Sequence, residues 1–166
     1  MSFSADTDRG AKDVEIRNKG NGQWLVTELA RGGPNMIGGD ETTTNQYGLE
    51  LILDLHGCDV SKFTRVSIRA YFEELCDLID MQREDLHFWD DIDVAEEDKQ
   101  TSPHTQGTSA VQFILTSSIV IHALDQMKAV YINIFSCKVY NPKLAEEFSV
   151  QWFGATAASA RTIDRV

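Results

Sequence analysis

Apolar and polar positions follow one another in a pattern typical of a mixed α and β domain over most of this chain. Residues 48–57 form a short apolar run that ends at a glycine, which predicts a buried strand. Residues 61–81 have apolar positions at helical spacing, and Asp59 or Ser61 is a suitable N-cap for that helix. Residues 84–93 predict a second strand, and the polar residues after them predict a loop.

The C-terminal part of the pattern predicts further strands and a second helix. Residues 110–124 are rich in β-branched side chains but too long for one ordinary strand, whereas residues 128–137 alternate cleanly. Asn141 is a suitable cap and Pro142 suits the first turn of a helix that ends near Gly154. The order β-α-β-β-β-α predicts an α+β two-layer sandwich, with a mostly antiparallel sheet and its helices on one face.

The first 46 residues differ in composition from the rest of the chain. They are rich in glycine and turn-forming residues, and their one short apolar stretch, residues 24–29, predicts a strand or a brief helix. We therefore expect an N-terminal extension over residues 1–46, with a mobile tip, and a single domain over residues 47–166.

Composition and charge narrow the possible functions. The 42% of hydrophobic and 25% of charged residues are typical of a globular protein, and a net charge of −11 argues against a nucleic-acid partner. No apolar run is long enough to span a membrane and the N-terminus has no secretory signal, so we expect a cytoplasmic protein. Three cysteines without a metal-binding spacing argue against a structural zinc site and against a disulfide framework.

The acidic residues are unevenly distributed. Twelve of the 26 lie between Glu73 and Asp98, where Arg83 is the only basic residue. Two interpretations stay open: a solvated acidic face, or an acidic mouth that attracts a cationic small molecule.

Four residues between positions 109 and 137 have side chains suited to nucleophilic or acid–base chemistry. They are Ser109, Ser117, His122 and Cys137. Neighbouring strands of a sheet lie only about 5 Å apart, so a sheet can bring all four side chains together. A serine, a histidine and a thiol in one place can act as nucleophile, base and proton donor. Taken singly, a histidine or a cysteine in an apolar strand is more often a packing residue.

The order and spacing of these residues resemble the prokaryotic short form of the S-adenosylmethionine decarboxylase family. The resemblance covers roughly residues 47–154. It is carried by GLELILDLHGCD at 48–59, QGTS at 106–109, Ser117, IH at 121–122 and FSC at 135–137. It implies a homo-oligomeric enzyme that decarboxylates S-adenosylmethionine and so supplies the aminopropyl donor for polyamine (spermidine) synthesis.

The resemblance also implies a cofactor made from the chain itself, without a metal. The chain would cleave itself between Thr116 and Ser117, and Ser117 would become a pyruvoyl group that forms a Schiff base with the substrate amine. His122 matches the family residue that removes the α-proton of the serine, Ser109 matches one that assists the acyl shift, and Cys137 matches the proton donor of the decarboxylation. We expect the cleavage site to lie in a buried, strained strand, which favours the rearrangement.

Several positions depart from the family pattern. The glutamate before the cleaved serine is replaced by Thr116, and the histidine after it by Ser118. In the segment that binds the substrate, Leu124 replaces a tryptophan and Gln126 replaces the glutamate that holds the ribose. The aromatic residue that stacks on adenine is replaced by Thr101.

The loop after Thr101 is also longer than in the family, by two residues that are most simply His104 and Thr105. His104 is predicted to be a surface residue without a role. Three aromatic residues elsewhere in the chain are candidate replacements for the lost stacking residue: Phe88, Trp89 and Trp24.

These departures leave two alternative functions open. The first is a pyruvoyl-dependent arginine or ornithine decarboxylase on the same scaffold, since these amino acids need no adenosine contacts. The second is an uncleaved, non-catalytic homologue that acts as a binding or regulatory subunit, which Thr116 and Ser118 favour.

Overall fold

The computed structural model describes residues 46–166 and the backbone of two strands nearer the N-terminus. The chain divides into two units, Met1–Thr43 and Thr44–Val166. In the first unit, β1 (Val14–Asn18) pairs antiparallel with β2 (Trp24–Glu28), so the apolar stretch there is a strand and not a brief helix. The predicted mobile tip of the extension lies outside the described residues.

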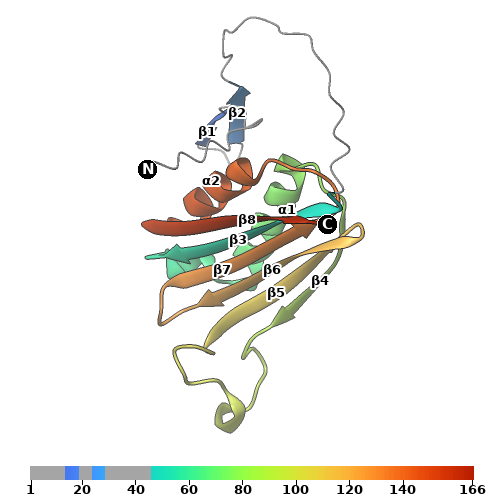
Figure 1. Cartoon of the computed structure of the whole chain (residues 1–166). Coiled ribbons are helices and arrows are strands. Elements are labelled where there is room, and N and C mark those ends of the chain that lie inside the picture. Colours follow the sequence, from blue (N-terminus) through green and yellow to red (C-terminus); the bar gives the residue numbers. More distant parts are fainter. Residues whose placement is uncertain (1–13, 19–23, 29–45) are drawn as a thin grey trace, which may run out of the picture. The chain divides into compact units, whose positions relative to one another are not determined.

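The second unit is built on a six-stranded antiparallel sheet with the strand order β4-β5-β6-β7-β3-β8 (Figure 1). The strands are β3 (Gly48–His56), β4 (Arg83–Trp89), β5 (Gly107–Ile114), β6 (Ser117–Leu124), β7 (Ala129–Ser136) and β8 (Ala157–Arg165). The helices α1 (Arg65–Leu78) and α2 (Pro142–Phe153) cover one face of the sheet. Within this unit the other face carries no helix, and we call it the open face. The α+β two-layer architecture predicted from the sequence is confirmed.

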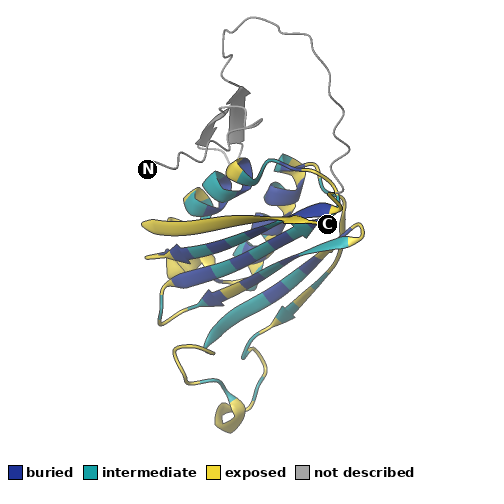
Figure 2. Ribbon diagram, viewed as in Figure 1, coloured by how far each residue is buried: buried dark blue, intermediate teal, exposed yellow. Residues whose placement is uncertain are grey.

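The central strands bury one face because apolar side chains occupy every second position. Leu51, Leu53 and Leu55 of β3 are at most 1% exposed, and Ile132 and Ile134 of β7 are fully buried. Figure 2 shows this alternation as bands of different burial along β3, β6 and β7. Each such side chain contributes about 1.5–3 kcal/mol on burial, so the helix-covered side of the sheet forms the core.

The start of α1 differs from the sequence prediction. Thr64 caps the helix, because its side chain accepts a hydrogen bond from the N–H of Ser67. Asp59, one of the two predicted caps, instead accepts from the N–H of Ser61 at the start of a short 3-10 helix (Val60–Lys62). Both predicted caps were therefore wrong, because Asp59 and Ser61 precede Thr64, the residue that caps α1.

Both ends of α2 agree with the sequence prediction. The Asn141 side chain accepts hydrogen bonds from the first two free N–H groups of the helix, and Pro142 occupies its first position. Gly154 ends the helix at a φ of 60°, a left-handed conformation that glycine adopts without strain.

Two strands differ from the predicted pattern. The apolar run over residues 110–124 is two strands, β5 and β6, joined by a turn at Leu115 and Thr116. The strand β8 was not predicted, because its sequence AASARTIDR has no apolar alternation. All its residues are exposed (Figure 2), and it is held to the edge of the sheet by pairing with β3 along its whole length.

Gly48 lets the start of β3 approach the end of β7. A Cβ atom at this position would lie 2.4 Å from the carbonyl oxygen of Ser136, which is closer than non-bonded atoms can approach. The close packing of these two backbones therefore requires a glycine, and it fixes the main chain immediately before Cys137.

Candidate active site

One group of candidate residues lies at the turn between β5 and β6. Ser117 is the first residue of β6, and its Oγ accepts a hydrogen bond from the Cys137 N–H at 3.1 Å. The same hydroxyl donates to the Cys137 Sγ at 3.7 Å, and the Thr116 Oγ1 lies 3.0 Å from that sulfur. The expected cleavage-site serine and the expected proton donor are thus in direct contact.

Thr116 has a strained backbone conformation. Its φ is 61°, in the left-handed region that a β-branched residue rarely adopts, at a cost of about 1–3 kcal/mol. The residue is exposed and belongs to the two-residue turn between the strands. The sequence-based expectation of a buried, strained strand was therefore wrong in place: the strain lies in an exposed turn, because the chain has to reverse there.

The surroundings of Cys137 favour its thiolate. The hydroxyls of Thr116 and Ser117 lower the pKa of this thiol below its ordinary value, because they can donate to the charged sulfur. The two other cysteines are buried, and burial raises the pKa of Cys58 to about 11 and that of Cys76 to about 12. Of the three thiols, Cys137 is therefore the one suited to proton transfer near neutral pH.

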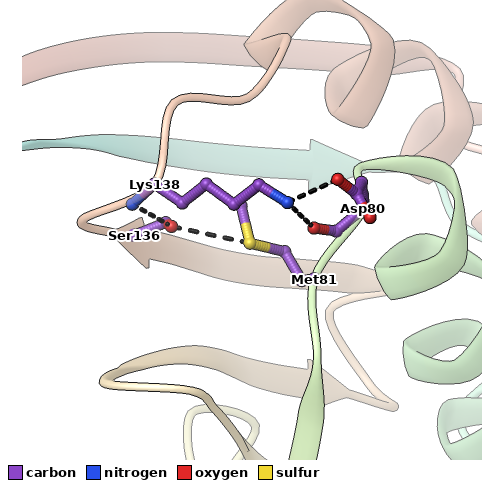
Figure 3. Close-up of polar contacts among 4 residues, drawn as sticks. All are labelled: Asp80, Met81, Ser136 and Lys138. Atoms are coloured by element: carbon purple, nitrogen blue, oxygen red, sulfur yellow. Dashed lines mark hydrogen bonds and ion pairs between the residues drawn. The ribbon is translucent and has the colours of Figure 1, made fainter.

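Polar contacts anchor the segment that carries Cys137 (Figure 3). The Ser136 Oγ accepts from the Lys138 N–H at 2.9 Å and donates to the Met81 Sδ at 3.6 Å. The Lys138 Nζ donates to a main-chain and a side-chain oxygen of Asp80. Because Asp80 and Met81 lie between α1 and β4, these contacts tie the end of β7 to that connection.

A second group of candidate residues lies at the opposite end of the β5–β6 hairpin. Ser109 of β5 and His122 of β6 are register partners, and the Ser109 Oγ lies 2.8 Å from the Nδ1 of His122. The residues on either side of His122, Ile121 and Ala123, are buried on the helix-covered face, so strand alternation places the pair on the open face.

The structure does not bring these two groups together within one chain. Ser117 and His122 are five residues apart on the same strand, which corresponds to about 16 Å. The expectation that one sheet places all four side chains in one spot was therefore wrong. The rise along a strand keeps Ser117 away from His122, and the register pairs His122 with Ser109 instead.

A cavity of about 600 Å³ opens beside the second group. It is lined by Trp89, His104, Thr105, Ser109, His122, Leu124 and Tyr131. We call it the histidine cavity. Its lining combines aromatic, apolar and hydrogen-bonding side chains, and within residues 46–166 no carboxylate contributes to it.

The predicted substrate-binding residues are only partly in this cavity. Leu124 lines it, whereas Thr101 and Gln126 do not, and the Gln126 amide instead donates to a neighbouring glutamine. His104 and Thr105 do line the cavity, although His104 was predicted to have no role. The sequence carried no signal for this, because the path of a long loop depends on what it packs against.

A second cavity, of about 570 Å³, lies near the start of α1 and contains the carboxylates of Asp90, Asp91 and Asp125. Arg65 and Asp90 form two hydrogen bonds of 2.6 Å, which lower the pKa of that aspartate. Burial raises the pKa of Asp125. Two carboxylates of the acidic stretch, Asp90 and Asp91, thus line this second cavity, whereas none of its carboxylates lines the histidine cavity.

In the part of the chain that the structure describes, no three His, Cys, Asp or Glu side chains are grouped so that they could hold a metal ion. No helix there is long and apolar enough to cross a membrane.

Comparison with known proteins decides the family. The model of the S-adenosylmethionine decarboxylase family matches residues 49–166. The chain belongs to this family. The resemblance seen in the sequence is thereby confirmed, and S-adenosylmethionine decarboxylases are carboxy-lyases.

A solved structure supports the same fold. The crystal structure of the adenosylmethionine decarboxylase from Aquifex aeolicus is similar to this chain with a TM-score of 0.59 at 18% sequence identity. The match covers 74% of this chain and 92% of the Aquifex chain. A search of curated proteins found no match. Family and fold together support a function of the S-adenosylmethionine decarboxylase type.

Proposed function

We propose that this protein is a self-processing, pyruvoyl-dependent decarboxylase of S-adenosylmethionine that supplies the aminopropyl donor for polyamine synthesis. The observation that carries the proposal is the contact between Ser117 and Cys137 at the strained turn, in a chain of this family. This contact puts the proton donor of the proposed decarboxylation beside the residue that would become the pyruvoyl group.

The cleavage begins at the strained peptide bond. The Ser117 Oγ attacks the carbonyl carbon of Thr116, the C–N bond breaks, and the released nitrogen takes a proton, so that an ester replaces the amide. A base then removes the α-proton of Ser117 and the ester bond breaks, which leaves a carboxylate on Thr116. The remaining unsaturated residue hydrolyses to a ketone with loss of ammonia. Breaking this bond releases the strain at Thr116.

The roles after cleavage follow from the same contacts. The pyruvoyl group supplies the electron sink for the loss of the substrate carboxylate. Cys137 donates a proton to the carbon that has lost carbon dioxide, and its lowered pKa makes its thiol a stronger acid than an ordinary cysteine.

In this proposal two copies of the chain complete the site. A base about 16 Å from Ser117 cannot remove its α-proton, so His122 of the same copy is too far away. A second copy packed on the open face brings its own Ser109 and His122 to Ser117 of the first. The partly buried side chains of Val111, Val120 and Phe135 give that face an apolar surface for such packing. We therefore propose a homo-oligomer.

The histidine cavity favours S-adenosylmethionine over arginine or ornithine. A cationic amino-acid tail is normally held by a carboxylate, and the described lining of this cavity has none. Its aromatic side chains suit the adenine ring and the sulfonium of S-adenosylmethionine.

The intact mass of freshly purified protein tests the proposal. We expect two fragments, 1–116 and 117–166, the smaller one lighter than its sequence mass by one ammonia. S-adenosylmethionine, arginine and ornithine are then offered side by side, and only the first should release carbon dioxide. Ser117→Ala should stay a single inactive chain.

Three results would overturn the proposal. Decarboxylation by Ser117→Ala excludes the pyruvoyl mechanism. Carbon dioxide from arginine or ornithine alone assigns the same scaffold to another substrate. A chain that stays uncut on long incubation favours a binding or regulatory role.

A further inference from the structure

A row of four side chains crosses the sheet at the level of the serine–histidine pair. In the sheet register, Trp89 of β4 lies opposite Ser109 of β5. Ser109 lies opposite His122 of β6, and His122 lies opposite Tyr131 of β7. Register partners share one face of a sheet, and all four side chains line the histidine cavity. The pair therefore lies between two aromatic side chains on the floor of this cavity.

The two aromatic side chains, Tyr131 and Trp89, differ in whether their rings already pack against another ring. The ring of Tyr131 packs edge-on against His56, with 6.0 Å between the ring centroids. Trp89 is 56% exposed although it borders the cavity, and no other ring of the described residues packs against its indole. A large, exposed π surface beside the reactive pair is available to a planar ligand.

The neighbouring aromatic residue on β4 faces away from the cavity. Phe88 pairs with Ala110, which is buried on the helix-covered side of the sheet. The guanidinium groups of Arg65 and Arg69 lie over the Phe88 ring, 5.8 and 5.7 Å from its centroid, so this ring already has cationic partners. Of the aromatic candidates on β4, Trp89 is thus the one beside Ser109, and the Trp24 side chain lies outside the described residues.

We propose that Trp89 is a specificity-determining residue that stacks against the adenine ring of S-adenosylmethionine. The inference rests on the proposed function, since that function supplies the ligand. It assigns the stacking to β4, because Thr101, at the position where the family pattern has its aromatic residue, has no ring and does not line the cavity. Leu124 of β6 lines the same cavity and offers an apolar contact for the same ring.

Binding measured without catalysis tests this inference. In the Ser117→Ala background, which cannot form the pyruvoyl group, adenosine and S-adenosylmethionine are titrated by calorimetry. Trp89→Ala should raise both dissociation constants about tenfold or more, whereas Trp89→Phe, which keeps a ring, should stay within about threefold of the parent. Phe113→Ala is the matched control, because Phe113 is another exposed ring on the open face but is not part of the cavity. It should leave both constants unchanged.

Three results would overturn the inference: no adenosine binding by the parent, an unchanged dissociation constant in Trp89→Ala, or a loss in Trp89→Phe equal to that in Trp89→Ala. All three are read from the uncut Ser117→Ala protein. Failure of the proposed function is read separately, from the intact mass and the carbon dioxide release of the unmodified chain. In processed enzyme, Trp89→Ala should raise KM for S-adenosylmethionine and leave kcat nearly unchanged.

Discussion

Cys137 differs from the other two cysteines in what surrounds its sulfur. Two hydroxyl groups lie near it and lower its pKa, whereas burial raises the pKa values of Cys58 and Cys76. The thiolate is the reactive form of a cysteine. We therefore expect iodoacetamide to alkylate Cys137 first, and at a lower pH than an unperturbed thiol with a pKa of 9.0.

Thr116→Val tests the part played by the threonine hydroxyl. It keeps the shape of the side chain but removes the oxygen 3.0 Å from the Cys137 Sγ. The pKa of Cys137 should rise, so alkylation should slow at pH values below the raised pKa and reach the same plateau above it. The measurement is the pH dependence of alkylation of the uncut chain, followed by mass spectrometry. Thr162→Val, on the edge strand β8 and in neither cavity, is the control, and an unshifted profile in Thr116→Val would contradict the assignment.

At the scale of single residues, the sequence marked candidate residues but did not predict which of them are neighbours. Spacing along the chain marked Ser109, Ser117, His122 and Cys137 as candidates. Which of them touch depends on strand register, and register depends on where the chain turns. The turn at Leu115 and Thr116 pairs His122 with Ser109 and leaves Ser117 beside Cys137.

The β5–β6 turn stores strain at Thr116 that the proposed cleavage would release. Thr116→Gly removes the cost of a positive φ, so it should stabilise the uncut chain by about 1 kcal/mol and slow its cleavage. Urea unfolding in the Ser117→Ala background measures the first effect, and the rate at which fragment 117–166 accumulates measures the second. Thr116→Val is the matched control, since it also lacks the hydroxyl but keeps the strain. Cleavage of Thr116→Gly as fast as that of Thr116→Val would show that strain plays no part.

Stability should also be sensitive to a single added methyl group where β3 approaches β7, at Gly48. Gly48→Ala places a Cβ atom against the backbone oxygen of Ser136, and neither backbone can move without disturbing the sheet. Overpacking of this kind costs about 1–3 kcal/mol, so the midpoint of urea unfolding should fall. The shift should also move the segment before Cys137 and change the pH profile of its alkylation. An unchanged midpoint together with an unchanged profile would refute this.

Elements with a strong hydrophobic pattern were predictable, and an element without one was not. The strand β3 and the helix α2 followed from apolar spacing and, for α2, from Asn141, Pro142 and Gly154. The strand β8 buries no side chain and is held to β3 by backbone hydrogen bonds and by the ion pair of Arg165 with Glu50, neither of which needs an apolar pattern. Its existence therefore depends on an unpaired strand edge, which only the assembled sheet provides.

On the scale of the whole molecule, no carboxylate of the acidic stretch lines the histidine cavity. Asp90 and Asp91 line the second cavity, near the start of α1, and Glu73 lies on α1 itself. From the sequence alone, the acidic stretch could have been an acidic mouth that attracts a cationic substrate such as arginine or ornithine. The positions of these carboxylates remove that support for the two amino acids as substrates.

One copy of the chain cannot bring together on its own all the residues that the proposed cleavage needs. The serine–histidine pair of the open face and the Ser117–Cys137 pair lie at opposite ends of one hairpin, yet the proposed cleavage needs both. Two inactive variants should therefore rescue each other. His122→Ala keeps Ser117 and Cys137, and Ser117→Ala keeps Ser109 and His122. Neither should be cut alone.

Co-expression of these two variants is the decisive measurement. If His122 acts across the interface, a His122→Ala chain should be cut wherever its partner is a Ser117→Ala chain, so about half of the His122→Ala chains should be cut when equal amounts of the two chains mix at random. A mass tag on one chain shows which of them is cleaved. As a control, a chain with both substitutions replaces Ser117→Ala and should restore nothing. Cleavage of His122→Ala alone, or no cleavage in the mixture, would place the base elsewhere.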